Sequence, residues 1–388
     1  MYTEIPSMGM HHELSRMKQL DSTNKNHLAG YIRHLGLKSL AASSIKERLW
    51  RIYSFLIFTG FKDAKTVSAA QVEDYVIHRK TDPSRRGKPC APATIRGDII
   101  ALRLFFRWLV PKKEAKLFNQ IENKKTHNKF PVERLLNRRD VEKIVNACDT
   151  QRDRALVMIL WDSGARITEI LSRNVGNIEF DRYGAVMVVE GKTGQRRLRL
   201  TACTGDLQNW INIHPLRDDS GAPLFLTYNH DNFGRKRLNA NTVRNRLKAL
   251  AKHAGVTKLV HPHAFRHARL TDFAKQGFNE MDLRIIAGWG EASAMSAVYI
   301  HMSGSDIEKK ILQKAGLADE ADMKEISLEP IRCPRCKNIN AYDSLFCRIC
   351  SAALSETAAK QIDSMHLSVI NNPRQVQEWA LKMQGSAS

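Results

Sequence analysis

Apolar residues in the first third of the chain recur at intervals of three and four, the spacing of one buried face on an α-helix. One such run follows Ser43 and Ser44, either of which can cap a helix. Its apolar positions are Ile45, Leu49, Ile52, Tyr53 and Leu56, and a second run over residues 93–109 has Ile95, Ile99, Leu102, Phe106 and Leu109. The pattern predicts a small helical domain over residues 24–110.

The helical pattern is lost over residues 111–134 and then returns. In this segment apolar residues are few, and lysine, asparagine and glutamate are frequent. We interpret it as a basic linker. From residue 135 to residue 316 the spacing is again helical, with Asn137 and Asp140 placed to cap the first helix. The second domain is therefore expected over residues 135–316.

One interruption inside this second domain has the period of β-strands. Residues 185–190 and 197–200 are β-branched or alternate between apolar and polar, and they flank Gly191-Lys192-Thr193-Gly194. Two short strands around such a turn predict a β-hairpin. The fold class expected for the chain is mainly α with a small β-sheet (α+β).

The chain continues with a cysteine-rich segment over residues 331–351 and a polar tail, expected to be helical, over residues 356–388. The segment holds two Cys-x-x-Cys pairs separated by ten residues: Cys333, Cys336, Cys347 and Cys350. Two such pairs can offer four thiolates to one tetrahedral Zn²⁺, which predicts a structural zinc site in a short zinc ribbon. A redox dithiol or disulfide pair is the alternative.

The charge of the chain points to a polyanion as partner. Lysine and arginine number 61 against 40 acidic residues, a formal net charge of +21. Such an excess favours nucleic acid, with an anionic membrane as the weaker alternative. No run approaches the ~20 apolar residues needed to span a bilayer, and residues 1–18 lack a signal-peptide core. We expect a cytoplasmic, nucleoid-associated protein with no membrane partner. The basic linker could follow the outside of a DNA duplex, or serve as a plain spacer.

Several polar residues are arranged in an order that suits phosphodiester cleavage. They are Arg166 after Ser163-Gly164-Ala165, Lys192 on the hairpin, His263 and Arg266 in Pro262-His263-Ala264-Phe265-Arg266-His267, Trp289 in Ala287-Gly288-Trp289, and Tyr299. Two arginines can neutralise the phosphate oxygens in the transition state, and a tyrosine can form a covalent ester. A lysine can protonate the leaving oxygen. Each residue alone has a plainer explanation, such as a surface charge for Lys192 or a buried phenol for Tyr299.

Residues from about 24 to 315 resemble a tyrosine recombinase of the phage-integrase and Xer type. The resemblance implies a helical core-binding domain at 24–110 and a catalytic domain at 135–316. It makes Arg166 and Arg266 the phosphate-binding arginines, with Glu169 supporting Arg166. His263 belongs to the His-x-x-Arg motif, Lys192 takes the role of general acid, and Tyr299 that of nucleophile. Trp289 stands where histidine is commoner; it can pack and donate one hydrogen bond, but it cannot exchange a proton.

The function implied by this resemblance is site-specific DNA recombination through a 3′-phosphotyrosyl intermediate. It would act on double-stranded DNA, form a tetramer on paired sites and need no catalytic cofactor. The ribbon resembles that of archaeal relatives. A type IB topoisomerase, which would relax supercoils by similar chemistry, is one alternative. A DNA-binding regulator that keeps the fold without catalysis is the other.

Overall fold

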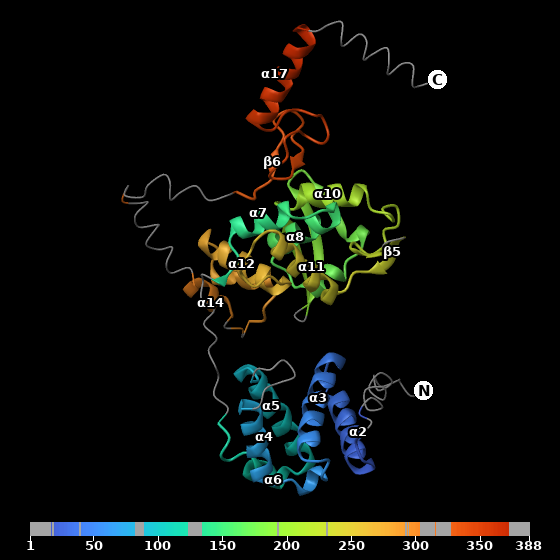
Figure 1. The fold of residues 1–388 in the computed structure, drawn as a ribbon, viewed down its shortest axis with the longest axis vertical. Helices are drawn as coiled ribbons and strands as arrows, with labels where there is room; N and C mark the ends of the chain where they lie inside the picture. The colour runs from blue at the N-terminus through green and yellow to red at the C-terminus, as the bar shows by residue number, and fades with distance from the viewer. Residues whose placement is uncertain are drawn as a thin grey trace. The chain divides into compact units, whose positions relative to one another are not determined.

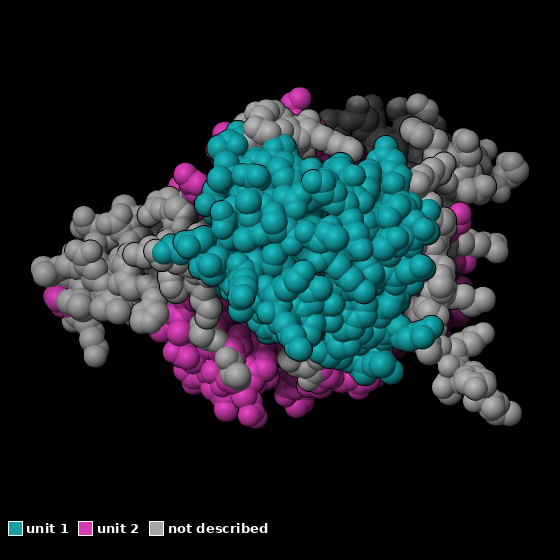
Figure 2. Space-filling model, turned by 90° about the horizontal axis from the view of Figure 1, so that it is seen from below, with its two compact units in different colours: residues 1–129 teal, residues 130–388 magenta. Residues whose placement is uncertain are grey.

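The computed structural model describes residues 17, 19–38, 40–81, 89–122, 134–191, 194–229, 232–291, 293, 295–302, 315 and 327–371. The chain divides into two compact units, residues 1–129 and 130–388 (Figure 2). No helix of the described residues is long and apolar enough to cross a membrane. The fold is mainly helical with small antiparallel sheets, as the sequence predicts.

The first unit is a helical bundle (Figure 1). Its elements are α2 (Ser22–Leu37), α3 (Ala42–Phe58), the 3-10 turn η1 (Ala64–Thr66), α4 (Ala69–Thr81), α5 (Pro92–Leu109) and α6 (Pro111–Leu117). The apolar faces predicted on α3 and α5 form one core, in which Leu49, Leu102 and Phe106 are fully buried. The predicted serine cap is wrong: α3 begins at Ala42, two residues earlier than a cap at Ser43 would allow, and the cap residue Ala41 makes no side-chain capping bond.

The segment interpreted as a linker is partly structured. Its first residues form α6, and Leu117, Phe118 and Ile121 are buried in the core of the first unit. Arg103 donates a hydrogen bond to the carbonyl of Phe118 at 3.0 Å. Few apolar residues suffice to anchor a short segment, which is why its composition resembles that of a spacer. Residues 123–133 lie outside the described part of the chain.

Helix α8 (Gln151–Ser163) forms the centre of the second unit. Helices α7 (Arg138–Asn146), α10 (Thr204–Asn212) and α12 (Pro262–Lys275) pack on it (Figure 1). The unit also contains α9 (Ile167–Leu171), the 3-10 turn η3 (Val175–Asn177), α11 (Ala240–His253), α13 (Glu280–Ala287) and α14 (Met295–Met302). The capping pair predicted at Asn137 and Asp140 is present at the start of α7.

The sheet of this unit has three antiparallel strands in the order β1-β2-β3. They are β1 (Ile178–Asp181), β2 (Gly184–Gly191) and β3 (Gly194–Leu200), and β2 and β3 form the predicted hairpin with Gly191 paired to Gly194. A separate pair, β4 (Leu226–Asn229) and β5 (Asn232–Arg237), is not predicted by the sequence. Its β5 sequence, Asn-Phe-Gly-Arg-Lys-Arg, lacks the alternation that marks a strand.

The cysteine-rich segment packs directly on the helical core of the second unit. It contains the short strands β6 (Ile331–Arg332) and β7 (Ile339–Asn340) and is followed by α17 (Glu356–Asn371). Leu328 is buried in the same core as α8, and Tyr342 packs against it. Arg154 of α8 donates to the carboxylate of Asp343 at 2.6 Å. The expected helical tail is present as far as residue 371, and residues 372–388 are not described.

Candidate active site

Arg166 is positioned by the turn between α8 and α9. Gly164 ends α8 in the left-handed conformation with φ 55°, and Arg166 occupies the cap position of α9. Its backbone N–H and its Nη1 both donate to the Glu169 carboxylate, at 2.8 and 2.9 Å. About a third of the Arg166 side chain stays exposed (36%), while that of Glu169 is 2% exposed. The guanidinium therefore keeps a surface free for an anion.

Two arginines share the carboxylate of Glu169. Burial by itself raises the pKa of this group, but hydrogen bonds from Arg196 and Arg166 outweigh burial and lower the pKa to about 2. Glu169 is thus ionised across the whole physiological range. The role of support for Arg166, implied by the resemblance, agrees with these contacts.

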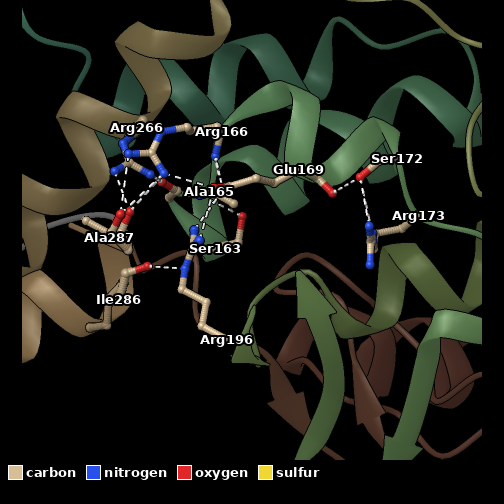
Figure 3. A network of polar contacts seen from close by, with 12 residues as sticks. Ser163, Ala165, Arg166, Glu169, Ser172, Arg173, Arg196, Arg266, Ile286 and Ala287 are labelled. Atoms are coloured by element: carbon tan, nitrogen blue, oxygen red, sulfur yellow. Dashed lines mark hydrogen bonds and ion pairs between the residues drawn. The ribbon is translucent and has the colours of Figure 1, made fainter. Parts of the chain in front are cut away.

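Arg266 is held at the carboxyl end of α13. Its Nη2 donates to the Ala287 carbonyl at 2.7 Å and its Nη1 to the Gly164 carbonyl at 3.0 Å (Figure 3). Arg166 Nη1 approaches the same Ala287 carbonyl at 3.4 Å. The two arginines, 100 residues apart in sequence, therefore meet at one carbonyl. Burial and then the charge of Arg166 lower the pKa of Arg266 to about 10, which leaves it cationic at neutral pH.

Tyr299 lies on α14 and is almost fully buried, with 1% of its surface exposed. Its ring stacks on Trp289 with centroids 5.4 Å apart and on His267 with centroids 5.6 Å apart. The hydroxyl forms a short hydrogen bond with His267 Nδ1. Burial raises the pKa of Tyr299 to about 12, against the opposing charge of Arg266. In this structure the phenol is protonated and held.

His263 and His267 lie one turn apart on α12, with ring centroids 4.3 Å apart. His263 is exposed, whereas His267 is buried. Although part of His263 is exposed, desolvation of its ring by the packed residues around it, followed by the charge of Arg266, lowers the pKa of His263. Burial, followed by His263 and Arg266, lowers the pKa of His267 to about 4, so this ring is neutral at physiological pH while its Nδ1 shares a hydrogen bond with the Tyr299 hydroxyl.

Trp289 takes part in the site as a packing residue. It is half-buried, and its ring lies 5.6 Å from the Arg266 guanidinium carbon as well as against Tyr299. A flat aromatic face can bind a cation and a second ring at once. The indole thus connects Arg266 to Tyr299.

Five of the six residues predicted for catalysis come together: Arg166, His263, Arg266, Trp289 and Tyr299. Lys192 lies outside the described residues. The sequence interpretation gave no role to His267 or Arg196, which contact Tyr299 and Glu169. For His267 a signal existed, since it follows His263 by four residues on one helix and so shares its face. For Arg196 the sequence holds no comparable signal.

The four predicted cysteines form a second site in the same unit. Their sulfur atoms all lie within 4.8 Å of one another. Cys333 Sγ is 3.6 Å from Cys350 Sγ, and Cys336 Sγ is 3.5 Å from Cys347 Sγ. Four thiolates on one tetrahedral zinc, at about 2.3 Å each, would be about 3.8 Å apart. The separations therefore suit a single metal ion.

The backbone around the cysteines repeats one turn twice. Lys337 N–H donates to the Cys333 carbonyl, and Ser351 N–H donates to the Cys347 carbonyl. Lys337 and Ser351 both have positive φ, 61° and 55°, where glycine is favoured. Two non-glycine residues thus adopt the less favourable left-handed conformation, and the turns that they complete bring the four cysteines together.

Comparisons with known proteins agree with this geometry. Residues 134–305 match the phage integrase family. Tyrosine recombinase XerC of Escherichia coli O157:H7 (strain EC4115 / EHEC) is 24% identical over 286 residues, which cover 70% of this chain and 90% of XerC. Tyrosine recombinase XerD of Listeria innocua serovar 6a is 26% identical over 277 residues, covering 69% of this chain and 90% of XerD.

Solved structures share the fold. The XerH site-specific recombinase bound to its difH substrate has a TM-score of 0.54 at 17% identity, covering 80% of this chain and 89% of that one. A lambda integrase dimer bound to a COC′ core site has a TM-score of 0.56 at 15% identity, covering 78% of this chain and 83% of that one. Residues 134–305 therefore form a domain of the phage integrase family, and the chain is a site-specific tyrosine recombinase.

Proposed function

We propose that Tyr299 cleaves one DNA strand by forming a 3′-phosphotyrosyl bond. The tyrosine oxygen bonds to phosphorus, the bond from phosphorus to the 5′ oxygen breaks, and that oxygen leaves as a hydroxyl after taking a proton. A 5′-hydroxyl from a second DNA then attacks the phosphotyrosine, which reverses the step and exchanges strands. The observation that carries the proposal is the grouping of Tyr299 with Arg166 and Arg266 around α13 and α14.

The roles of the individual residues follow from their contacts. Arg166 and Arg266 neutralise the non-bridging phosphate oxygens, and His263, exposed beside them, donates a hydrogen bond to the same phosphate. His267 Nδ1 receives the phenol proton, because it lies in direct hydrogen-bond contact with the Tyr299 hydroxyl. Trp289 fixes the tyrosine ring and Arg266 by packing. Lys192 supplies the proton to the leaving 5′ oxygen, the role implied by its motif.

The substrate in this proposal is double-stranded DNA, with two sites and four subunits in the active assembly. The net charge of +21 supports a polyanionic partner. Among the similar structures, the XerH recombinase is bound to its difH substrate, and the lambda integrase is a dimer bound to a core site. A topoisomerase would show the same covalent chemistry, but it would relax supercoils without a preference for sequence.

A trapping assay tests the nucleophile. Nicked duplexes carrying a site selected from random DNA by binding should give a covalent protein–DNA adduct with the wild type. Tyr299→Phe should bind the same duplex and trap nothing, because the ring remains and only the attacking oxygen is lost. If the wild type forms no adduct on any selected site, the chain is a non-catalytic DNA-binding protein and the proposal fails.

We also propose that Cys333, Cys336, Cys347 and Cys350 hold one structural Zn²⁺. The residues fit the ion in number, spacing and ligand type. Metal analysis of the reduced protein should give one zinc per chain, and Cys347→Ser should abolish it. Cys90→Ser, in the first unit, is the matched control and should keep the metal. A disulfide in place of zinc would support the redox alternative.

A further inference from the structure

Arg196 is a largely but not fully buried arginine beside the site, with 10% of its side chain exposed. It lies on β3, two residues beyond the turn glycine Gly194. Its Nη1 and Nη2 donate to the two oxygens of Glu169, at 3.0 and 2.7 Å, and its Nε donates to the Ile286 carbonyl at 3.0 Å. One guanidinium thus connects the hairpin, α9 and the carboxyl end of α13 (Figure 3).

Three consecutive carbonyls at the end of α13 each lie close to a different arginine. Ile286 accepts from Arg196 and Ala287 from Arg266, while Arg166 approaches the Gly288 carbonyl at 3.4 Å. The last carbonyls of a helix have no partner within the helix and lie at its negative end, so they favour cations. The end of α13 therefore acts as a template that fixes the spacing of three guanidinium groups, two of which bind the phosphate in the proposed function.

Arg166 depends on this arrangement more than Arg266 does. Its contacts with the Gly288 carbonyl are long, 3.4 and 3.5 Å, beyond the usual range for N–H···O bonds. Within the described part of the chain, its one short side-chain contact is with Glu169, at 2.9 Å. Because Arg196 occupies both oxygens of Glu169, it determines how that carboxylate is turned toward Arg166.

Two glycines leave the space that the ion pair of Arg196 and Glu169 fills. A Cβ on Gly288 would lie 2.6 Å from Arg196 Nη1 and 2.9 Å from its Cζ. A Cβ on Gly191 would lie 2.5 Å from Glu169 Oε1. Real side chains do not approach so closely, so the backbone is shaped around the pair formed by Arg196 and Glu169.

We propose that Arg196 is a positioning residue for strand cleavage, which holds Arg166 in place through Glu169 and fastens the hairpin to the end of α13. The inference rests on the proposed function, since it assumes that Arg166 binds the scissile phosphate. The plainer alternative is an ion pair that stabilises the fold and leaves the rate of cleavage unchanged.

The test separates DNA binding, cleavage and folding for Arg196→Ala. We expect the single-turnover rate of adduct formation to fall by about 10–100-fold, the size seen when a supporting residue lets a reactive group move by about 1 Å. The Kd for the same DNA should stay within about threefold, since one largely buried arginine makes few phosphate contacts. The control is Arg199→Ala on the same strand, whose partner Asp181 is exposed; it should cleave like the wild type.

A second variant tests whether the effect passes through Glu169. In a Glu169→Gln background, Arg196→Ala should lower the cleavage rate by less than about threefold, because residues of one network are not additive. Should Arg196→Ala fail to fold, Arg196→Gln, which keeps one donor for Glu169, should show the same separation of binding from cleavage.

Two results would overturn the inference. One is an Arg196 variant that forms adduct at the wild-type rate. The other is a loss of cleavage matched by an equal loss of DNA binding or of folded protein. Failure of the proposed function looks different, because then the wild type itself traps no DNA.

Discussion

At the scale of single residues, the most consequential feature is that Tyr299, the proposed nucleophile, is buried and protonated. Tyr299 is 1% exposed, and its pKa is raised to about 12. The rings that hold it, Trp289 and His267, also keep water away from it. A phenol in this state needs a neutral base in contact with its proton. His267 meets that requirement, because its lowered pKa keeps the ring neutral and its Nδ1 is in hydrogen-bond contact with the phenol.

His267→Ala should therefore slow adduct formation by about 100-fold, within the range for loss of a general base. DNA affinity should change little, since His267 is buried. His253→Ala, at the exposed end of α11, serves as the control. Single-turnover trapping on the nicked duplex gives the rate. A wild-type rate for His267→Ala would show that the phenol proton leaves by another route.

Stability at acid pH should report the same histidine. In the unfolded chain His267 takes up a proton near pH 6.5, whereas in the fold its pKa is about 4. Between these values the unfolded state binds more protons, so stability is lost as pH falls from about 6.5 to about 4. Urea midpoints measured across this window should fall less steeply for His267→Gln than for the wild type. If the urea midpoints of the two proteins fell equally steeply with pH, burial of His267 would not be what lowers stability in acid.

At the scale of elements, some features follow from the local sequence pattern and others depend on tertiary packing. The β2–β3 hairpin and the apolar faces of α3 and α5 follow from periodicity in the sequence, and the structure confirms them. The cysteine-rich segment is different, because its position depends on α10. The backbone of Ala341 lies so close to Gly205 that a Cβ there would be 2.3 Å from the Ala341 nitrogen. A glycine in α10 thus allows the segment to pack on the core.

Gly205→Ala should separate the cysteine-rich segment from α10. The added methyl meets backbone, which cannot rotate away, so overpacking should lower the free energy of unfolding by about 1–3 kcal/mol. Gly221→Ala is a fair control, since its Cβ would meet only the Asp219 side chain, at 3.2 Å. Chemical denaturation of both variants provides the comparison. If Gly205→Ala were as stable as Gly221→Ala, the backbone near Ala341 would be able to move away from the added methyl group at little cost.

At the scale of the whole molecule, the dominant property is the charge of +21 carried by a chain of two compact units. A protein that neutralises DNA phosphates releases their counterions, which makes its affinity fall with salt. The contribution of counterion release does not depend on the DNA sequence, so it favours binding to DNA without selecting a site. Selection of the site has to come from contacts with base edges or from DNA shape.

DNA binding should accordingly weaken by about 10³–10⁵-fold between 50 and 200 mM salt if six to ten phosphates are contacted. Arg166→Ala should reduce the slope of log affinity against log salt by about one, because it removes one phosphate contact. Equilibrium binding at several salt concentrations measures both. A DNA affinity that stays the same at all salt concentrations would contradict an interface dominated by phosphate contacts.

The sequence by itself determined the chemistry and the local folds of this protein. Helical faces, the hairpin and the two cysteine turns depend on residues close together in the chain, and so do the motifs that contain Arg166, Arg266 and Tyr299. Only the tertiary structure decided which residues support them. Arg196 reaches Glu169 and Ile286 across 27 and 90 residues, and His267 reaches Tyr299 across 32. Contacts over such separations arise from packing of whole elements, which no local spacing records.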